Sequence, residues 1–202
     1  VDMFSHVCER YFSDDVEWGV TDRMCEGVLR TLVDVGPRCM AELSAYSLRA
    51  EIMWISTIAQ NNTLSIGRNE DWSVHTIANE ISALYDTAHG ATLSIVMGSW
   101  MRVASERAPR RFARYAQEVF GLEPKRSGNE TDAVRELAVR GIEATEAFFR
   151  SLGMPVGFAD AGLPTDGVER MLDRIVFYGD DHAIGAVARL DRDDCRRILR
   201  MA

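Results

Sequence analysis

Residues 71–101 read DWSVHTIANEISALYDTAHGATLSIVMGSWM, and this stretch contains His75 and His89, two of the four histidines in the chain. Its apolar residues recur at the three- and four-residue spacing of an α-helix. On one unbroken helix the two histidines would share a face yet lie about 21 Å apart. Ligands of one ion cannot be that far apart. If both bind the same ion, the helix must break before His89, and Asp86 and Gly90 are suitable turn residues.

A third histidine lies near the start of the chain. Asp2 and His6 are spaced i, i+4, which on an α-helix places both side chains on one face about one turn apart. One acid and three imidazoles suit Fe(II) or Zn(II). Together with His75 and His89, these residues suggest a metal site.

The same residues carry a family resemblance. The chain resembles the C-terminal helical domain of the iron-containing, group III, alcohol dehydrogenases, and within them the butanol dehydrogenase-like branch. The matching segments are Asp2 to His6, DWSVH (71–75), EISALYD (80–86), His89-Gly90, RAEIMWISTIAQ (49–60) and GIEATEAFFRSLGMP (141–155). The similarity therefore covers essentially the whole chain.

The resemblance implies an all-α fold, the helical bundle-like C-terminal domain of the dehydroquinate synthase-like and iron-containing alcohol dehydrogenase proteins. Residues 1–202 would form a single metal-binding domain. By position in the family pattern, the ligands of one Fe(II) or Zn(II) ion are Asp2, His6, His75 and His89. A dinucleotide-binding domain that binds NAD(H) or NADP(H) would precede Val1, because residues 1–202 contain no glycine-rich phosphate loop after a strand. This chain alone is expected to bind metal without turnover.

The activity implied by the resemblance is hydride transfer between a small alcohol or aldehyde and nicotinamide, in an enzyme whose family tends to form homodimers. The metal would act as a Lewis acid toward the substrate oxygen. Asn79 lies one turn beyond His75, where the family commonly has a second histidine that binds substrate or relays a proton. Asn cannot exchange a proton at neutral pH, so we expect the metal site to persist without this relay. Tyr85, near the predicted break, is a candidate substitute hydroxyl.

Three alternatives remain open at this stage. A polyol dehydrogenase or dehydroquinate synthase-like enzyme shares the fold but has a different ligand set. A non-catalytic helical domain would use the four ligands to close a structural metal site, whereas a catalytic ion must also accept substrate or water. A plain helical interaction domain without metal would require the four-residue spacing to be accidental.

Composition excludes several other classes. The net charge of −8 and a pI near 5.1 argue against nucleic acid or an anionic membrane as partner. The uncharged stretch 87–101 is shorter than a membrane span, and the N-terminus shows no signal peptide. The basic segment 107–114 is interpreted as a solvated helix face. Four cysteines without a CxxC pair fit a reducing cytoplasm and a place in the core.

Several local expectations follow from the residue pattern. Thr21 is expected to cap a helix that Gly36-Pro37 ends. Within 44–60, Met53 and Trp54 broaden an apolar stripe that should be buried on much of its circumference.

Further capping and positioning roles are expected near the histidines and at the C-terminus. Asp71 should cap the helix that contains His75, and Asp86 should orient His89 through its free ring nitrogen. Asp191 and Asp194 form an acidic version of a capping box. His182 is expected in a polar surface turn.

Overall fold

The computed structural model describes residues 1–13, 19–125 and 129–202, and the regular structure in these ranges is helical. The helices are α1 (Asp2–Tyr11), α2 (Val20–Ala41), α3 (Tyr46–Gln60), the short 3-10 helix η1 (Thr63–Ser65), α4 (Ser73–Tyr85), α5 (His89–Arg107), α6 (Pro109–Phe120), α7 (Glu130–Ser151), α8 (Val168–Leu172) and α9 (Arg192–Met201). These ranges contain no β-strand, only the isolated bridges Tyr178–Ala183 and Ile184–Leu190. The predicted all-α fold is confirmed.

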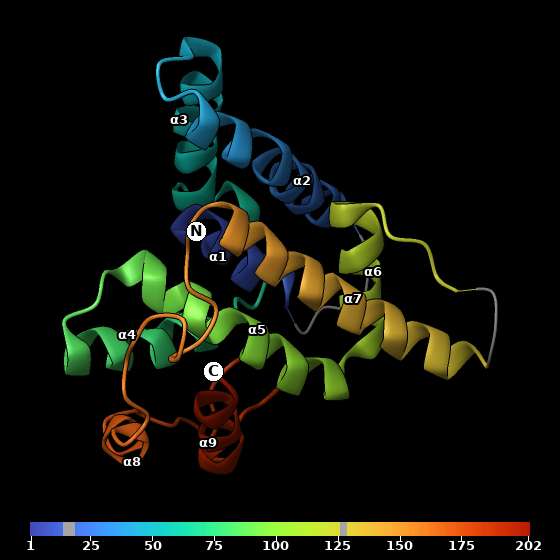
Figure 1. Cartoon of the computed structure of the whole chain (residues 1–202). Helices are drawn as coiled ribbons and strands as arrows, with labels where there is room; N and C mark the ends of the chain where they lie inside the picture. Colours follow the sequence, from blue (N-terminus) through green and yellow to red (C-terminus); the bar gives the residue numbers. More distant parts are fainter. Residues whose placement is uncertain (14–18, 126–128) are drawn as a thin grey trace.

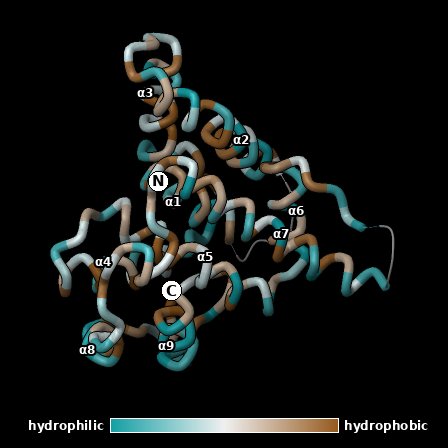
Figure 2. Tube along the Cα trace, viewed as in Figure 1, coloured by the Kyte–Doolittle hydropathy of each residue, from teal (hydrophilic) through white to brown (hydrophobic). Residues whose placement is uncertain are grey.

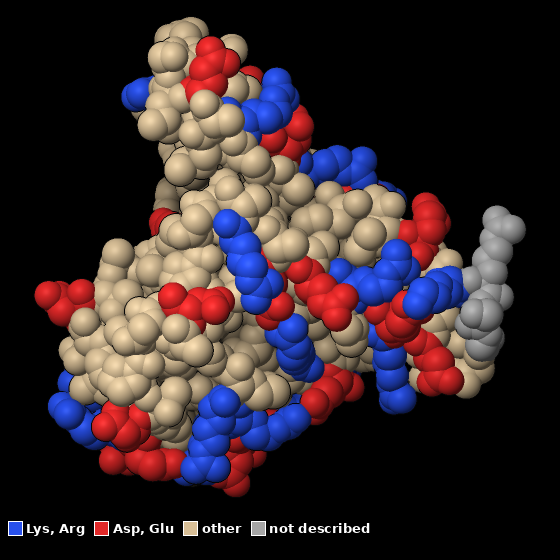
Figure 3. Space-filling view, in the orientation of Figure 1, with Lys and Arg blue, Asp and Glu red and all other residues tan. Residues whose placement is uncertain are grey.

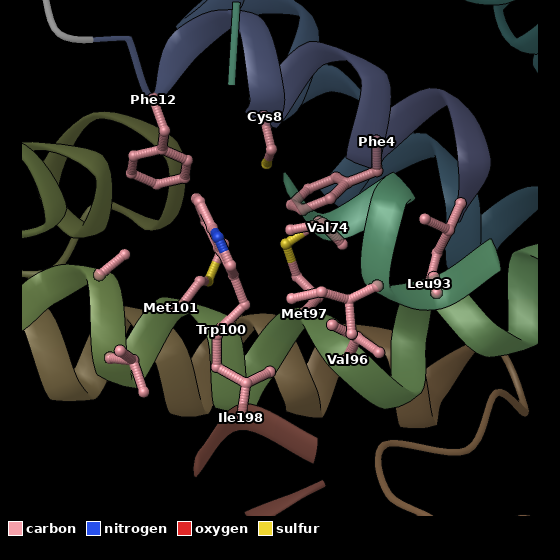
Figure 4. Packing of buried hydrophobic residues seen from close by; sticks show 14 of the residues in the cluster. Phe4, Cys8, Phe12, Val74, Leu93, Val96, Met97, Trp100, Met101 and Ile198 are labelled. Carbon is pink, nitrogen blue, oxygen red and sulfur yellow. The ribbon is translucent and has the colours of Figure 1, made fainter. Parts of the chain in front are cut away.

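Helix α5 lies at the centre of the molecule. Every residue from Thr92 to Met101 is buried, so this helix is covered on all sides and belongs to the core. It packs against α1, α4, α6, α7 and α9, and the α2–α3 hairpin extends away on one side with α8 and α9 on the other (Figure 1). Between α1 and α5, Phe4 and Phe12 meet Met97 and Trp100 (Figure 4). The segment 71–101 thus supplies the centre of the core.

The predicted break between His75 and His89 is present. Helix α4 ends at Tyr85, and Asp86 follows with a left-handed backbone (φ 50°) that short polar side chains tolerate better than most. Helix α5 then begins at His89. Because the chain reverses over so few residues, α4 and α5 pack side by side and their histidines are brought together.

Helix α2 corrects two predictions. It begins after Gly19 rather than at a Thr21 cap, and the Thr21 hydroxyl instead donates to the Ile66 carbonyl at 3.3 Å. It also continues through Gly36-Pro37 to Ala41. Pro37 removes one helical hydrogen bond, but Gly36 lies so close to the ring of Phe148 that an added Cβ would be 3.4 Å from it. Tertiary packing of α2 therefore outweighs the local stop signal.

Helix α3 is much less buried than predicted. Met53 and Trp54 are 70% and 60% exposed, whereas Ile55 and Ala59 are buried. The reason is that α3 packs against α2 and α1 along one side only, and its other faces turn to solvent (Figures 1 and 2). The prediction of broad burial was wrong for this helix.

The basic segment 107–114 is also not a simple solvated face. Arg111 and Arg114 on α6 are buried. Arg111 contacts Asp22, and Arg114 binds Glu26 through Nε at 2.7 Å and Nη2 at 3.0 Å. Buried carboxylates on α2 thus draw these guanidinium groups inward, because a buried charge needs a partner.

The C-terminal part largely follows the sequence pattern. Asp191 and Asp194 form the predicted capping box at the start of α9. Helix α8 is a short helix that ends at Leu172. Cys8, Cys25 and Cys195 are buried as predicted, whereas Cys39 is half-buried.

The surface carries both signs of charge. Basic and acidic side chains intermingle on the visible face rather than separating into patches (Figure 3). Of the helices in the described ranges, none is both long and apolar enough to cross a membrane.

Candidate metal centre

The first turns of α1 present the acidic residue of the site. Asp2 and His6 lie on one face of this helix, with Asp2 Oδ1 3.6 Å from His6 Nε2. The two residues are one turn apart, as the i, i+4 spacing predicts. Two candidate ligands therefore come from one helix, and their relative position depends on helical geometry alone.

Helices α4 and α5 add the other two histidines. Asp2 Oδ1 lies 3.6 Å from His75 Nε2 and 3.4 Å from His89 Nε2. The ring centroid of His75 lies 4.5 Å from that of His6 and 5.3 Å from that of His89. All four residues singled out from the sequence are thus brought together, from three different helices.

These residues fit a divalent cation. Ligand atoms about 2.1 Å from one ion in tetrahedral geometry lie roughly 3.4 Å apart, close to the separations measured from Asp2 Oδ1. One ligand atom each from Asp2, His6 and His75 can be chosen so that all lie within 4.8 Å of one another, and His89 lies outside this triad but approaches it at Asp2 Oδ1, 3.4 Å from its Nε2. Asp2 Oδ1 and His75 Nε2 are also buried atoms without a hydrogen-bond partner in the described structure. A cation between them would satisfy both.

The close packing of these ionisable side chains shifts their pKa values. Burial, reinforced by the neighbouring His75, lowers the pKa of His6 to about 4. Burial acts in the same direction on His75, but the adjacent carboxylates of Asp2 and Glu9 outweigh it and raise its pKa to about 9. The close approach of His75 lowers the pKa of Asp2. His6 is therefore neutral at neutral pH, whereas the two carboxylates favour a positive charge on His75.

Glu9 is a residue of this site that the sequence analysis missed. It lies on α1, is fully buried, and its Oε2 is hydrogen-bonded to His75 Nδ1. Burial raises the pKa of Glu9, and the bond with His75 acts against that rise. The available signal was the spacing Asp2, His6, Glu9, which is i, i+4, i+7 and places all three on one helical face.

Trp72 packs against two of the histidines. Its ring centroid lies 5.1 Å from that of His6 and 5.2 Å from that of His75. Arg10 lies over the same ring at 5.0 Å and donates to the His6 carbonyl at 3.0 Å. The indole thus separates part of the site from water.

The start of α4 is held by buried carboxylates. Asp71 accepts the Ser73 backbone N–H at 3.1 Å, so its side chain caps the first turn of α4 as predicted. The formal N-cap is Trp72, whose side chain makes no capping bond. Asp71 also accepts the N–H groups of Ala186 at 2.7 Å and Val187 at 3.0 Å, which ties the C-terminal loop to α4.

The remaining predicted residues lie farther from the cluster. Asn79 is exposed on α4, one turn beyond His75. The Tyr85 hydroxyl is buried beside Gly167, and its ring packs against Phe158 at 6.5 Å. The described contacts of Asn79 and Tyr85 include none of the four candidate ligands.

Two other polar residues take positions of their own. Asp86 is exposed and makes no hydrogen bond with His89 among the described residues, so its expected orienting role is not seen. Its left-handed backbone ends α4 instead. His182 lies in an exposed turn, as expected.

The fold and the site together define an all-helical domain with an Asp-His cluster suited to a divalent metal. The model of the Fe-containing alcohol dehydrogenase family, C-terminal, matches residues 1–202. The chain belongs to this family, and the resemblance noted from the sequence is confirmed.

Several curated and solved proteins are similar to this chain. A probable NADH-dependent butanol dehydrogenase 1 of Bacillus subtilis is 36% identical over 99% of this chain and 50% of its own length. An NADPH-dependent aldehyde reductase of Escherichia coli is 30% identical over 100% of this chain and 50% of its own. The crystal structure of an NADH-dependent butanol dehydrogenase A from Thermotoga maritima superposes with a TM-score of 0.88 and 33% identity, over 100% of this chain and 50% of that one. The chain thus spans about half the length of these relatives.

Proposed function

We propose that this chain is the metal-binding C-terminal half of an NAD(P)-dependent alcohol dehydrogenase or aldehyde reductase. The observation that carries the proposal is the convergence of three histidines, from three helices, on Asp2 Oδ1 at 3.4 to 3.6 Å. Family membership and relatives named butanol dehydrogenase and aldehyde reductase support it.

Asp2, His6, His75 and His89 would hold an Fe(II) or Zn(II) ion. When bound, that ion supplies Lewis acidity toward the substrate oxygen, and the nicotinamide carries the hydride. Trp72 packs edge-on against the rings of His6 and His75 and so covers part of their surface. The protein thereby holds the ligand side chains in fixed positions and places an aromatic ring beside two of them.

The exposure of the ligands favours a catalytic over a purely structural metal. His6 and His75 are 16% and 12% exposed, whereas Asp2 and His89 are 41% and 43% exposed. Structural sites close around their ion, while catalytic sites keep a position for substrate or water. The side of the site formed by Asp2 and His89 is therefore the side from which substrate would enter.

Asn79 and Tyr85 are both candidates for contact with the substrate, and the structure favours Asn79. Asn79 is exposed one turn beyond His75, so its amide can hydrogen-bond a substrate oxygen but cannot relay a proton. Tyr85 packs beside Gly167 and Phe158, which favours a packing role for it. We propose that Asn79, rather than Tyr85, contacts the substrate.

The proposal includes a second half of the enzyme, which would bind the nicotinamide cofactor. Because the chain spans half the length of its relatives, NAD(H) or NADP(H) would bind to a preceding half, and the substrate would lie between the two. We further propose a homodimer. A polyol dehydrogenase of the same fold is less well supported, since the ligand set found here is the Asp and three His of the alcohol dehydrogenases.

Metal content tests the proposal directly. The purified chain is loaded anaerobically with Fe(II) or Zn(II), desalted and subjected to elemental analysis, beside His75→Ala and His89→Ala. His182→Asn is the matched control, because His182 is exposed in a turn away from the site and Asn tolerates its left-handed backbone. Near-stoichiometric metal is expected in the parent and in the control.

Loss of metal in both alanine variants, with unchanged helical circular dichroism, would support one shared site. A parent that binds no metal, or a His182→Asn variant that loses it equally, would overturn the proposal. Metal retained in His89→Ala alone would remove His89 from the ligand set.

A further inference from the structure

We propose that Glu9 is the positioning residue of the metal centre, which holds His75 in the one tautomer that presents Nε2 to the ion. This inference rests on the proposed function, since it presumes a metal between the four candidate ligands. It adds a residue that acts on the metal through a ligand rather than by direct contact.

Glu9 makes its bonds with both carboxylate oxygens. Oε2 is bonded to His75 Nδ1, and Oε1 accepts the backbone N–H of Val74 at 2.7 Å and of His75 at 3.3 Å. The side chain is completely buried. A buried carboxylate is tolerated only when its oxygens are satisfied, and here three donors face it.

The beginning of α4 explains why these donors are available. The first N–H groups of a helix lack intrahelical partners, and the helix N-terminus favours negative charge. Trp72, the N-cap of α4, offers no side-chain acceptor. Glu9 therefore caps α4 from a different helix, and the free N–H groups of Val74 and His75 stabilise its charge.

The bond to Nδ1 selects the tautomer of His75. An ionised carboxylate can only accept, so in the neutral ring that binds a metal the proton lies on Nδ1 and the lone pair on Nε2. Nε2 points to the other side of the ring, where Asp2 Oδ1 lies 3.6 Å away. A carboxylate on the remote nitrogen of a metal-binding histidine also raises the basicity of the ligand.

Glu9 also fixes the distance between two helices that share the site. Asp2 and His6 lie on the same face of α1 as Glu9, whereas His75 lies on α4. The Glu9 carbonyl accepts the Asp71 N–H at 2.9 Å, a second link between α1 and the start of α4. A shift of α4 relative to α1 would break these bonds and separate His75 from Asp2.

The other two histidines lack such a partner. His6 Nδ1 is 3.4 Å from a guanidinium nitrogen of Arg10, which is a donor. Among the described residues, no carboxylate bonds to Nδ1 of His6 or His89. Of the carboxylates in these ranges, Glu9 is thus the one placed to set a ligand tautomer.

Co(II) affinity measured by chelator competition tests the inference on the purified chain. In Glu9→Gln the amide donates to Nδ1 and moves the proton to Nε2, so Co(II) affinity should fall about 10- to 100-fold, as for other outer partners of metal-binding histidines. Glu9→Asp keeps an acceptor-only group and should bind Co(II) more tightly than Glu9→Gln. Glu26→Gln is the matched control, because Glu26 is a buried carboxylate that binds Arg114 and not a histidine.

A second readout follows the tautomer itself. Long-range nitrogen–proton NMR spectra of the Zn(II)-loaded parent should show the His75 proton on Nδ1, and Glu9→Gln should reduce this form. Circular dichroism and urea unfolding of every variant separate loss of metal from loss of fold.

The outcomes are distinguishable. If the parent binds no Co(II), the proposed function fails and the role of Glu9 fails with it. If the parent binds one ion per chain but Glu9→Gln binds it equally tightly, only the role of Glu9 is overturned. Equal weakening in Glu26→Gln would likewise overturn it, since a general loss of stability would then explain the effect.

Discussion

The carboxylate oxygen Oδ1 of Asp2 lies 3.4 Å from Nε2 of His89, although the two residues stand near opposite ends of the first hundred residues. Asp2 is also within 3.6 Å of the imidazole nitrogens of His6 and His75. It is therefore the one anionic member of the candidate ligand set and the residue on which the three histidines converge.

Asp2→Asn should weaken Zn(II) binding by at least about 100-fold, more than loss of an outer partner costs. The physical reason is that an amide oxygen has no net charge to offset the divalent ion among three neutral imidazoles. Competition with a chromophoric chelator measures the affinity. An Asn variant that binds as tightly as the parent would show that Asp2 is not a ligand.

Buried Asp22 should make stability depend on pH. Arg68 donates to its Oδ1 at 2.7 Å, and Arg111 contacts the same oxygen. Burial opposes ionisation of Asp22, but the hydrogen bond from Arg111 and the charge of both cations outweigh it and lower its pKa. The ionised form therefore stabilises the fold above the unfolded pKa of about 3.9, and this stabilisation is lost as pH falls through the lower folded pKa.

Asp22→Asn should accordingly reduce the free energy of unfolding by about 3–5 kcal/mol at neutral pH, because two buried cations lose their partner. The deficit should persist at about pH 5 and shrink below about pH 4, where the Asp22 carboxyl becomes protonated first in the unfolded chain and, at lower pH, in the folded parent. Urea unfolding at these pH values measures it. Asp34→Asn is the control, since Asp34 pairs with Arg38 on the surface and should change stability by under about 1 kcal/mol.

Two helical glycines should respond to alanine with opposite signs. A Cβ on Gly141 of α7 would lie 2.7 Å from Ala116 Cβ and 3.1 Å from Ala116 Cα on α6. Gly141→Ala should therefore destabilise the protein by about 1–3 kcal/mol, because the backbone of α6 must move. Gly27 of α2 has open space around it, so Gly27→Ala should stabilise by up to about 1 kcal/mol through helix propensity.

Thermal unfolding of the two glycine variants provides the check. Equal melting temperatures for Gly141→Ala and the parent would mean that α6 and α7 do not approach each other this closely. A decrease for Gly27→Ala would mean that its side of α2 is covered.

Two tryptophans should differ strongly in their contribution to stability. Trp100 is fully buried and its indole N–H donates to Ser73 at 2.6 Å, so Trp100→Ala should cost about 3–5 kcal/mol. Trp54 is 60% exposed, so Trp54→Ala should change stability by about 0.5 kcal/mol or less. Urea unfolding followed by circular dichroism compares them. A large loss for Trp54→Ala would indicate that α3 is buried in solution.

Much of the candidate site could be predicted from residue spacing. The i, i+4 pair Asp2 and His6 needs only helical geometry to share a face. The separation of His75 and His89 required a break if they were to meet, and the turn at Asp86 supplies it. Both inferences are local, since each depends on a single helix or a single turn.

Other features could not be read from local pattern. Gly36-Pro37 carries a stop signal that packing of α2 overrides, and Met53 and Trp54 look like core residues although α3 turns them to solvent. Arg111 and Arg114 look like surface residues although α2 places carboxylates beneath them. In each case the decisive neighbour belongs to another helix.

The sequence by itself determined the helical character of the chain, the two pairs of candidate ligands and the turn that separates His75 from His89. Tertiary structure alone decided that these pairs meet at Asp2 Oδ1 and that Glu9 of α1 bonds His75 of α4. The physical reason is range: backbone hydrogen bonds and side-chain periodicity act within a few residues. The position of a buried carboxylate depends on which distant helix end offers it donors.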